Sequence, residues 1–217
     1  MTNGERPSTV DHRPSTLPRL YAILDSSCFV EDQALFQFAE DLLAGGVRLL
    51  QYRNKTGSSR QALSHARELR RLAGQRVRLI MNDRADLCLA AEFDGVHLGQ
   101  DDLSPAAARR IVGNALWVGV STHNPGQLAA ADQTDADYLA IGPVFPTTSK
   151  VNPDPVIGLE GVRAARALTR KPLVAIGGIT RANARSVIEA GADSVAVISD
   201  LLRHPRRSAQ EFLSLLR

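Results

Sequence analysis

The sequence predicts a single-domain α/β protein, a (β/α)8 TIM barrel with a disordered N-terminal tail. Short apolar runs alternate with helix-period segments eight times along the chain. The apolar runs are almost continuous, as expected for parallel strands covered by helices. At 217 residues, 44% of them hydrophobic, the chain falls in the size range in which α/β barrels form one domain. An open doubly wound sheet is the alternative, but the chain has no Gly-x-Gly-x-x-Gly fingerprint.

The first 18 residues differ from the rest in composition. They are rich in Pro, Ser, Thr and Arg and lack the apolar stretch of a secretory signal or a membrane span. We therefore expect a disordered polar tail at 1–18, a barrel at 19–217 and a cytoplasmic location. The two cysteines, Cys28 and Cys88, are too few for a disulfide framework and have no zinc-like spacing, so both are expected to be buried thiols.

Each of the eight units has an expected strand and an expected helix. Ser104-Pro105 and Asn124-Pro125 each place a capping side chain before a proline at the first helical position, and Gly45 and Gly191 fall where helices should stop. The expected strands are 20–24, 47–52, 77–81, 95–98, 116–120, 138–141, 172–176 and 195–198. The expected helices are 32–43, 60–73, 85–91, 105–112, 125–132, 159–168, 181–190 and 209–216.

The charge pattern excludes two classes of partner. The net charge is +3, from 26 basic and 23 acidic residues, and no basic run is interleaved with aromatic residues, so no nucleic-acid partner is expected. No membrane partner is expected either. The partners predicted here are small-molecule substrates, and the sequence leaves open whether the chain forms a homo-oligomer.

Polar residues follow the second expected strand. In a barrel, active sites lie at the C-terminal ends of the strands, which is where these residues are expected. Alternation sends Gln51, Arg53 and Lys55 to one side and Tyr52 to the other, so an amide and two cations converge. This pattern predicts an anion-binding element. The alternative is an ordinary exposed, charged loop.

Carboxylates follow the third and fourth strands. Asn82 and Asp83 stand directly after one buried run, and Asp102 follows the next. If the strands are parallel neighbours, the two aspartates leave the same end of the sheet and offer hard oxygen ligands for one Mg²⁺ ion. The alternative is that they only cap helix N-termini.

Strand five ends in Ser121, with His123 close behind it. The glycines of a nucleophile elbow are absent, so we interpret Ser121 as a hydrogen-bond donor to a leaving anion rather than a nucleophile. His97 lies inside the fourth strand and is predicted to be a packed, hydrogen-bonded barrel histidine.

The last three loops predict a second anion-binding element. The long loop after strand six carries three hydroxyl side chains and a lysine, and such loops usually bind ligands. Two glycines follow strand seven, and Ser199 would open a short helix after strand eight, in the standard phosphate site of many barrels. The residues are Thr147, Thr148, Ser149, Lys150, Gly177 and Gly178, with Ser199. Two anion-binding elements and a metal pair favour a reaction between a diphosphate and a monophosphate ester.

Seven motifs together resemble the thiamine-phosphate synthase family, in the right order and over nearly everything after the tail. They are Gln51-x-Arg53-x-Lys55, Asn82-Asp83, residues 94–102 (DGVHLGQDD), 119–123 (GVSTH), 142–150 (GPVFPTTSK), 176–179 (IGGI) and 191–199 (GADSVAVIS). The resemblance implies coupling of hydroxymethylpyrimidine diphosphate to hydroxyethylthiazole phosphate, which gives thiamine monophosphate and pyrophosphate.

The resemblance also implies roles for individual residues. Pyrimidine-diphosphate contacts fall on Gln51, Tyr52, Arg53, Asn54, Lys55, Asn82, Ser121 and Lys150, and thiazole-phosphate contacts on Thr147, Thr148, Ser149, Gly178, Ile198 and Ser199. Asp83 and Asp102 would bind Mg²⁺. Arg53, Lys55, Lys150 and Ser121 would be the catalytic residues, because they stabilise charge on the departing pyrophosphate. One position departs from the family, since Ser149 stands where threonine is common and keeps the hydroxyl.

Two other functions fit part of this pattern. A thiazole tautomerase is a barrel of similar outline that moves a proton on one thiazole phosphate, and it would need neither the metal pair nor the Gln-Arg-Lys element. A non-catalytic paralogue could bind thiazole phosphate or thiamine phosphate as a regulatory module. Retention of Asp83, Asp102, Arg53 and Lys150 argues against that second alternative.

Overall fold

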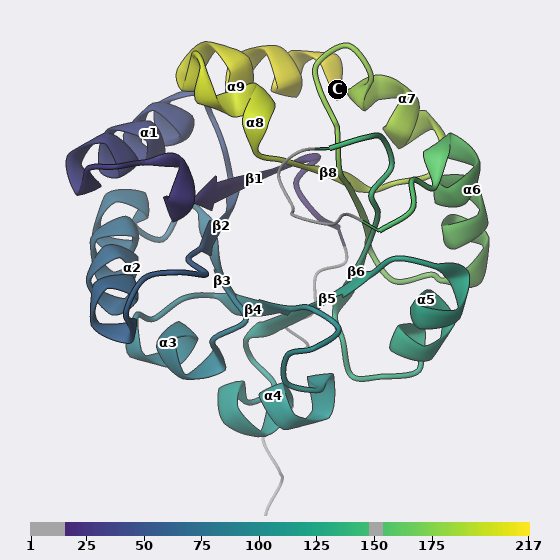
Figure 1. Ribbon diagram of the computed structural model, residues 1–217, viewed down its shortest axis with the longest axis horizontal. Coiled ribbons are helices and arrows are strands. Elements are labelled where there is room, and N and C mark those ends of the chain that lie inside the picture. Colours follow the sequence, from purple (N-terminus) through teal and green to yellow (C-terminus); the bar gives the residue numbers. More distant parts are fainter. Residues whose placement is uncertain (1–15, 148–153) are drawn as a thin grey trace, which may run out of the picture.

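The computed structural model shows eight parallel strands that close into a barrel surrounded by helices (Figure 1). It describes residues 16–147 and 154–217. The strands pair in chain order and β8 pairs with β1, so the predicted barrel is confirmed and an open sheet is not formed. The strand bounds are β1 Leu20–Asp25, β2 Leu49–Arg53, β3 Arg78–Asn82, β4 Gly95–Leu98, β5 Trp117–Thr122, β6 Tyr138–Ile141, β7 Leu173–Ile176 and β8 Ser194–Val197.

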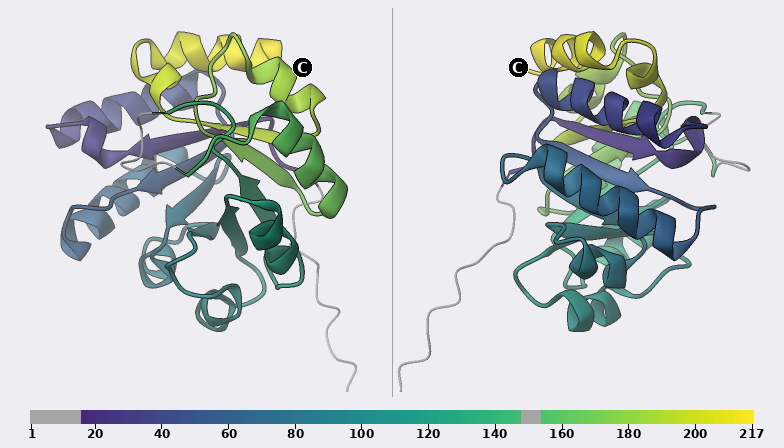
Figure 2. Two further views of the ribbon diagram at one scale, coloured as in Figure 1. Left: turned by 45° about the vertical axis from the view of Figure 1, so that its right-hand side comes forward. Right: turned by 90° about the vertical axis from the view of Figure 1, so that its left-hand side faces the viewer.

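The helices form an outer layer around the strands (Figure 2). A short 3-10 helix, η1 (Ser26–Cys28), follows β1. The α-helices are α1 Asp32–Ala44, α2 Ser59–Ala73, α3 Ala85–Ala90, α4 Pro105–Val112, α5 Pro125–Asp132, α6 Gly158–Leu168, α7 Ala184–Glu189, α8 Ser199–Leu202 and α9 Pro205–Leu215. None of the helices in the described ranges is long and apolar enough to cross a bilayer.

Strand alternation divides the core into an inner and an outer part. In β1, Ala22 and Leu24 face outwards and pack with the helices, whereas Tyr21 and Ile23 face the barrel interior. Leu17 belongs to the inner group and is only 7% exposed, although the expected tail included it. Residues 1–15 of that expected tail lie outside the described residues.

Most expected elements end within two residues of the observed ones, but two helices differ more. Helix α7 begins at Ala184 rather than Arg181, because Asn183 accepts a hydrogen bond from the Thr180 amide in a local turn. Helix α9 begins at Pro205, which fits the first helical position, whereas the apolar periodicity starts only at Ala209.

The two predicted N-caps are present, and one of the two predicted buried thiols is not. Ser104 and Asn124 accept hydrogen bonds from the third residue of their helices, at 3.2 and 2.9 Å. Cys88 is buried as expected. The prediction for Cys28 was wrong: this residue lies in η1 at the rim of the barrel and is exposed, because the chain leaves the sheet after Asp25.

Three arginine–aspartate clamps close the amino-terminal face of the barrel, opposite the strand ends that carry the site. In each clamp, an arginine near the C-terminal end of α2, α4 or α6 pairs with an aspartate. That aspartate directly precedes β4, β6 or β8, respectively. The same aspartate accepts a backbone amide from the preceding strand, which ties helix, loop and two strands together. The pairs are Arg70–Asp94, Arg109–Asp137 and Arg166–Asp193, at 2.6, 2.7 and 2.8 Å.

Candidate active site

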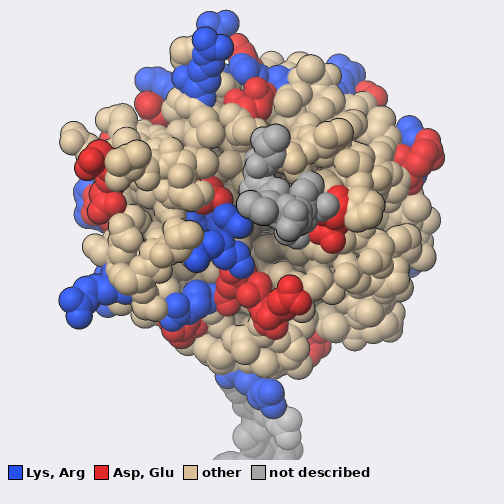
Figure 3. Space-filling view, viewed as in Figure 1, with Lys and Arg blue, Asp and Glu red and all other residues tan. Residues whose placement is uncertain are grey.

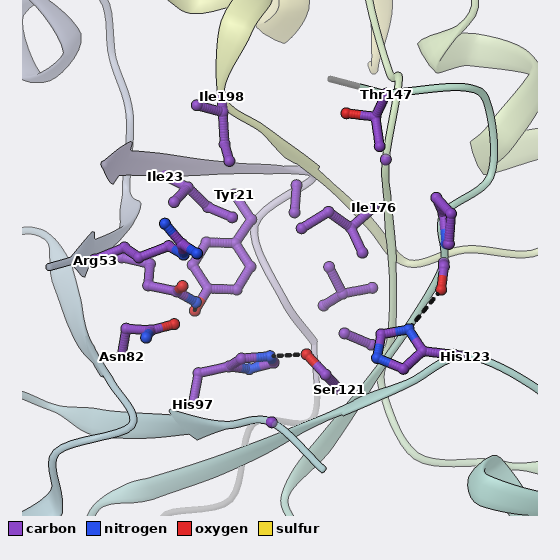
Figure 4. Close-up of a pocket in the computed structure, with 18 of the residues that line it drawn as sticks. Tyr21, Ile23, Arg53, Asn82, His97, Ser121, His123, Thr147, Ile176 and Ile198 are labelled. Atoms are coloured by element: carbon purple, nitrogen blue, oxygen red, sulfur yellow. Dashed lines mark hydrogen bonds between the residues drawn. The ribbon is translucent and has the colours of Figure 1, made fainter. Parts of the chain in front are cut away.

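A cavity of about 530 Å³ opens at the carboxyl ends of the strands. All eight strands or the loops that follow them contribute to its wall, as in other barrels that place reactive groups at this face. Basic and acidic side chains lie side by side around its mouth (Figure 3). The close-up shows side chains from opposite sides of the barrel pointing into one space (Figure 4).

Most of the predicted site residues line this cavity. They come from seven strand ends and the loops that follow them, which are far apart in sequence, and parallel pairing brings them together. The lining residues among those predicted are Gln51, Arg53, Lys55, Asn82, Asp83, Asp102, Ser121, Thr147, Gly178, Ile198 and Ser199. Thr148, Ser149 and Lys150 lie outside the described residues.

Two predicted residues are not brought into the cavity. Tyr52 faces outwards and is buried beneath α2, where its hydroxyl is 2.8 Å from Nδ1 of His65. The Asn54 side chain donates to that hydroxyl and accepts from the Gly57 amide. Strand alternation places Tyr52 on the opposite face from Gln51 and Arg53. Tyr52 and Asn54 therefore shape the loop that carries Lys55 and do not line the cavity.

Asp83 and Asp102 lie in contact across β3 and β4. Burial raises the pKa of Asp83, and its hydrogen bond with Asp102 raises it further. Burial also acts to raise the pKa of Asp102, but hydrogen bonds with Asp83 and from the Gly99 amide outweigh it, so the net shift is downward. The two shifts run in opposite directions because two adjacent carboxylates resist ionising together.

The backbone at Asp83 is held in an uncommon conformation. Its φ of 62° lies in the left-handed region, which costs a residue other than glycine about 1–3 kcal/mol. The Asp83 amide donates to the His97 carbonyl at 2.8 Å, which anchors this turn to β4. Its carboxylate also forms an ion pair with Lys55. The strained turn is thus what aims the carboxylate at both Asp102 and Lys55.

This carboxylate pair fits a magnesium ion. Asp83 and Asp102 are adjacent, partly buried carboxylates whose oxygens can act as metal ligands. Lys55 is their one cationic neighbour among these site residues, so a bound cation would further reduce the repulsion between them. In the described ranges, no three His, Cys, Asp or Glu side chains are grouped to hold a metal. Two protein carboxylates, completed by water and substrate phosphate, are the usual holding set for Mg²⁺ rather than for zinc.

Arg53 is fixed at the rim by a residue that the sequence analysis missed. Its guanidinium pairs with Asp25 at the end of β1. Asp25 is only 5% exposed and also accepts from the Ser27 amide and hydroxyl, at 3.0 and 2.7 Å. The signal was present, since Asp25 ends an apolar run as Asp83 does, but only pairing of β1 with β2 shows which cation it meets.

A polar layer forms the floor of the cavity. Tyr21, His97 and Ser121 lie around it (Figure 4). His97 is 7% exposed, and burial lowers its pKa to about 4, so the ring is neutral near pH 7. It is the packed, hydrogen-bonded histidine that the sequence predicted, with Tyr138 at 3.0 Å and Ser121 at 2.8 Å.

The opposite wall carries exposed backbone. Gly178 has a φ of 63°, and a Cβ atom there would lie 2.4 Å from the Pro146 carbonyl oxygen, so only glycine lets the loops after β6 and β7 pack this closely. Thr147 and Ile198 lie beside this wall (Figure 4). His123, missed as a lining residue, is 2.8 Å from the Gly142 carbonyl and 3.5 Å from the Asp154 carboxylate.

Comparisons with known proteins place this chain among close relatives. A family model described as thiamine monophosphate synthase matches residues 20–201. The chain is 64% identical over 203 residues to a thiamine-phosphate synthase of Koribacter versatilis, covering 92% of this chain and 96% of the relative. It is 46% identical to one of Chloroflexus aurantiacus, covering 83% of each. A thiamine phosphate pyrophosphorylase structure from Pyrococcus furiosus superposes with a TM-score of 0.81 at 34% identity, covering 91% of this chain and 95% of the other.

Proposed function

This chain belongs to the thiamine monophosphate synthase family, and from that premise we propose that it couples hydroxymethylpyrimidine diphosphate to hydroxyethylthiazole phosphate. The products are thiamine monophosphate and pyrophosphate, and the enzyme is a transferase of thiamine biosynthesis. The observation that carries the proposal is one cavity with a cationic, carboxylate-containing wall and a separate glycine-lined wall. A reaction that joins a diphosphate to a monophosphate needs both.

The cationic wall is proposed to bind the diphosphate. Arg53, held by Asp25, and Lys55 offer charges that oppose the negative charge developing on pyrophosphate as the carbon–oxygen bond breaks. Lys150 is proposed as a third cation on sequence grounds. Because Asp25 already holds Arg53 in place, this guanidinium would stabilise the departing anion with little reorganisation.

Asp83 and Asp102 are proposed to hold one Mg²⁺ ion. When bound, the ion would supply electrophilic stabilisation to the phosphate oxygens. Lys55 pairs with Asp83 in the structure, so its ammonium lies beside the carboxylates that would hold the ion and offers the diphosphate a further positive charge.

The bond changes require no general base. The carbon–oxygen electron pair leaves with pyrophosphate, and the aminopyrimidine ring delocalises the cation left on its methylene carbon. The thiazole nitrogen then donates its lone pair to that carbon and carries no proton to lose. Thr147, Gly178 and Ser199 are proposed to hold the thiazole phosphate on the facing wall, which fixes the approach of that nitrogen.

The two alternatives predict different requirements. A thiazole tautomerase would act on one substrate without the diphosphate, and a binding paralogue would release no pyrophosphate. The paired Asp83 and Asp102 favour the transferase, because neither alternative needs them. We also propose a cytoplasmic location, which the unpaired state of Cys28 and Cys88 supports.

Pyrophosphate release, measured with each substrate alone and with both, tests the proposal. Release should need both substrates and Mg²⁺. Asp83→Ala or Asp102→Ala should lower turnover by about 100-fold or more and raise the Mg²⁺ concentration that is needed. Asp86→Ala is the matched control, because Asp86 is exposed in α3 and pairs only with Arg84 in the described structure.

Two outcomes would count against the proposal. A wild-type protein that releases no pyrophosphate from the two substrates would exclude the transferase function. Full activity of Asp83→Ala at unchanged Mg²⁺ would exclude the metal site while leaving the transferase function standing.

A further inference from the structure

Five side chains form one continuous hydrogen-bonded chain across the cavity floor. The amide of Gln51 donates to the Tyr21 hydroxyl at 2.8 Å, and that hydroxyl is 3.0 Å from the hydroxyl of Tyr138. Tyr138 is 3.0 Å from Nδ1 of His97, whose Nε2 is 2.8 Å from the Ser121 hydroxyl. Each residue comes from a different strand, so the chain crosses the barrel. Its two ends line the cavity, and Tyr138 beneath them does not.

Counting hydrogens gives this chain a direction. Tyr21 already accepts from Gln51, so its single hydroxyl hydrogen must find an acceptor. Tyr138 is the acceptor within reach among the described groups, because it is the other partner recorded for that hydroxyl. Tyr138 then has one hydrogen of its own to give, and Nδ1 of His97 is its remaining partner. A buried hydroxyl left without an acceptor would cost about 1–3 kcal/mol, which favours this direction over the reverse.

The direction continues through the imidazole ring. His97 is buried, and in the described structure its two ring nitrogens meet hydroxyl groups rather than carboxylates. A ring in that setting is neutral, because an unpaired buried charge is far more costly than a buried neutral group. If Nδ1 accepts from Tyr138, the ring proton is on Nε2 and is donated to the Ser121 oxygen. The Ser121 hydroxyl hydrogen is then the only hydroxyl hydrogen in the chain that has no partner inside it.

We propose that Tyr138 is a positioning residue: by donating to Nδ1 it holds His97 as the Nε2–H tautomer and thereby turns the Ser121 hydroxyl into a hydrogen-bond donor that faces the cavity. The role assigned to that donor, stabilising the anion that departs, rests on the proposed function. The tautomer does not. At the other end of the chain, Gln51 donates to Tyr21 through its amide nitrogen, so its carbonyl oxygen stays free to accept from a ligand.

The barrel gives this chain a rigid frame. All five residues lie on strands, which hold side chains more firmly than loops do. Tyr21 and Tyr138 are each 1% exposed, and their rings meet edge to face at 6.1 Å. Gly119 leaves the space that the Tyr138 ring fills. The donor at Ser121 is thus fixed before any substrate binds, and no proton has to move for it to act.

Nitrogen NMR of the wild-type protein without substrate tests the tautomer directly. With ¹⁵N-labelled histidine, the unprotonated ring nitrogen resonates far downfield of the protonated one, and a His97→Gln variant assigns the signals. Near pH 7, we expect His97 to show the Nε2–H form. An Nδ1–H form would overturn the proposal, because the chain would then run in reverse and Ser121 would donate to the ring.

A double-mutant cycle tests whether Tyr138 acts through Ser121. Tyr138→Phe should lower kcat by about tenfold, the value of one hydrogen bond to a developing charge, with little change in KM for the thiazole substrate. In a Ser121→Ala background the same change should cost less than about twofold, since the donor is already absent. A tenfold loss in both backgrounds would show a merely structural role and refute the proposal.

A matched control separates this effect from loss of a buried hydroxyl as such. Ser208 is buried in α9, away from the cavity, and its hydroxyl has no partner in the described structure. Ser208→Ala should leave kcat unchanged. If Tyr138→Phe does not fold, the wild-type tautomer still decides the proposal. A wild-type enzyme without pyrophosphate release would count against the proposed function alone.

Discussion

Gly119→Ala is the substitution whose effect on the barrel can be worked out in most detail. Gly119 lies in β5, and a Cβ atom at this position would be 2.0 Å from Cζ and 2.4 Å from the hydroxyl oxygen of Tyr138. Ordinary contacts of this kind are 3.4 Å or longer. Tyr138 is 1% exposed and packed among other side chains, so the ring must be displaced together with its neighbours.

The cost has two parts. Overpacking a filled core costs about 1–3 kcal/mol. Displacement of the ring also breaks the bonds of its hydroxyl to Tyr21 and His97, both at 3.0 Å, and a buried hydroxyl left unpaired costs about 1–3 kcal/mol more. We therefore expect the free energy of unfolding to fall by about 2–6 kcal/mol, against a total of about 5–15 kcal/mol for a typical protein. Pyrophosphate release should fall as well.

Urea unfolding of Gly119→Ala and of one control variant measures this cost. Gly126→Ala is the matched control, because Gly126 is exposed in α5 and a Cβ atom there meets only the Asn124 side chain, at 3.3 Å. Alanine in a helix should stabilise by up to about 1 kcal/mol relative to glycine. If Gly119→Ala lay within 0.5 kcal/mol of wild type, on the order of a neutral surface change, the packing argument would be refuted.

Two further predictions concern stability. The pKa of His97 is lowered from 6.5 to about 4, so between these values the unfolded chain binds a proton that the native state does not, and stability must fall as the pH falls. Between pH 7 and pH 4, the free energy of unfolding of the wild type should therefore fall by about 3 kcal/mol because of His97, as measured by denaturant titrations at the two pH values. His97→Gln should lack this contribution. An equal pH dependence in the two proteins would contradict the lowered pKa of His97. Arg109→Met should cost about 3–5 kcal/mol, because it removes the cation that pairs with the 3% exposed Asp137 carboxylate in the clamp. Arg185→Met, which removes an exposed pair with Glu189, should cost no more than about 0.5 kcal/mol, and a similar loss for both variants would show that the clamp has no special weight.

Predictions that rest on one stretch of sequence agreed well with the structure. The eight apolar runs became eight parallel strands, and the caps at Ser104 and Asn124 formed as expected, because each depends on a few neighbouring residues. The convergence of Asp83 and Asp102 was also expected, since parallel neighbouring strands end on the same side. Local pattern was less informative for Cys28, whose burial depends on where the chain goes after leaving β1.

The hydrophobic pattern of the sequence could not predict contacts between side chains on different strands. Pairing of β1 with β2 brings Asp25 to Arg53, and the curvature of the closed sheet lets Tyr138 on β6 reach both Tyr21 on β1 and His97 on β4. Strand order and chain direction do not specify such meetings across the barrel interior, because they depend on the register and on which side chains are large enough to span it.

The sequence alone therefore determined the fold class, the face of the barrel that carries the site and most of the residues at the cavity wall. These features depend on the period and direction of the strands, which can be read from neighbouring residues in the sequence. Only the tertiary structure decided what stands behind that wall: which carboxylate holds Arg53, how the floor residues are linked, and in which direction their hydrogen bonds run. Those features follow from contacts between residues on different strands, from 24 positions apart for His97 and Ser121 to 117 for Tyr21 and Tyr138, and such contacts exist only once the barrel has closed.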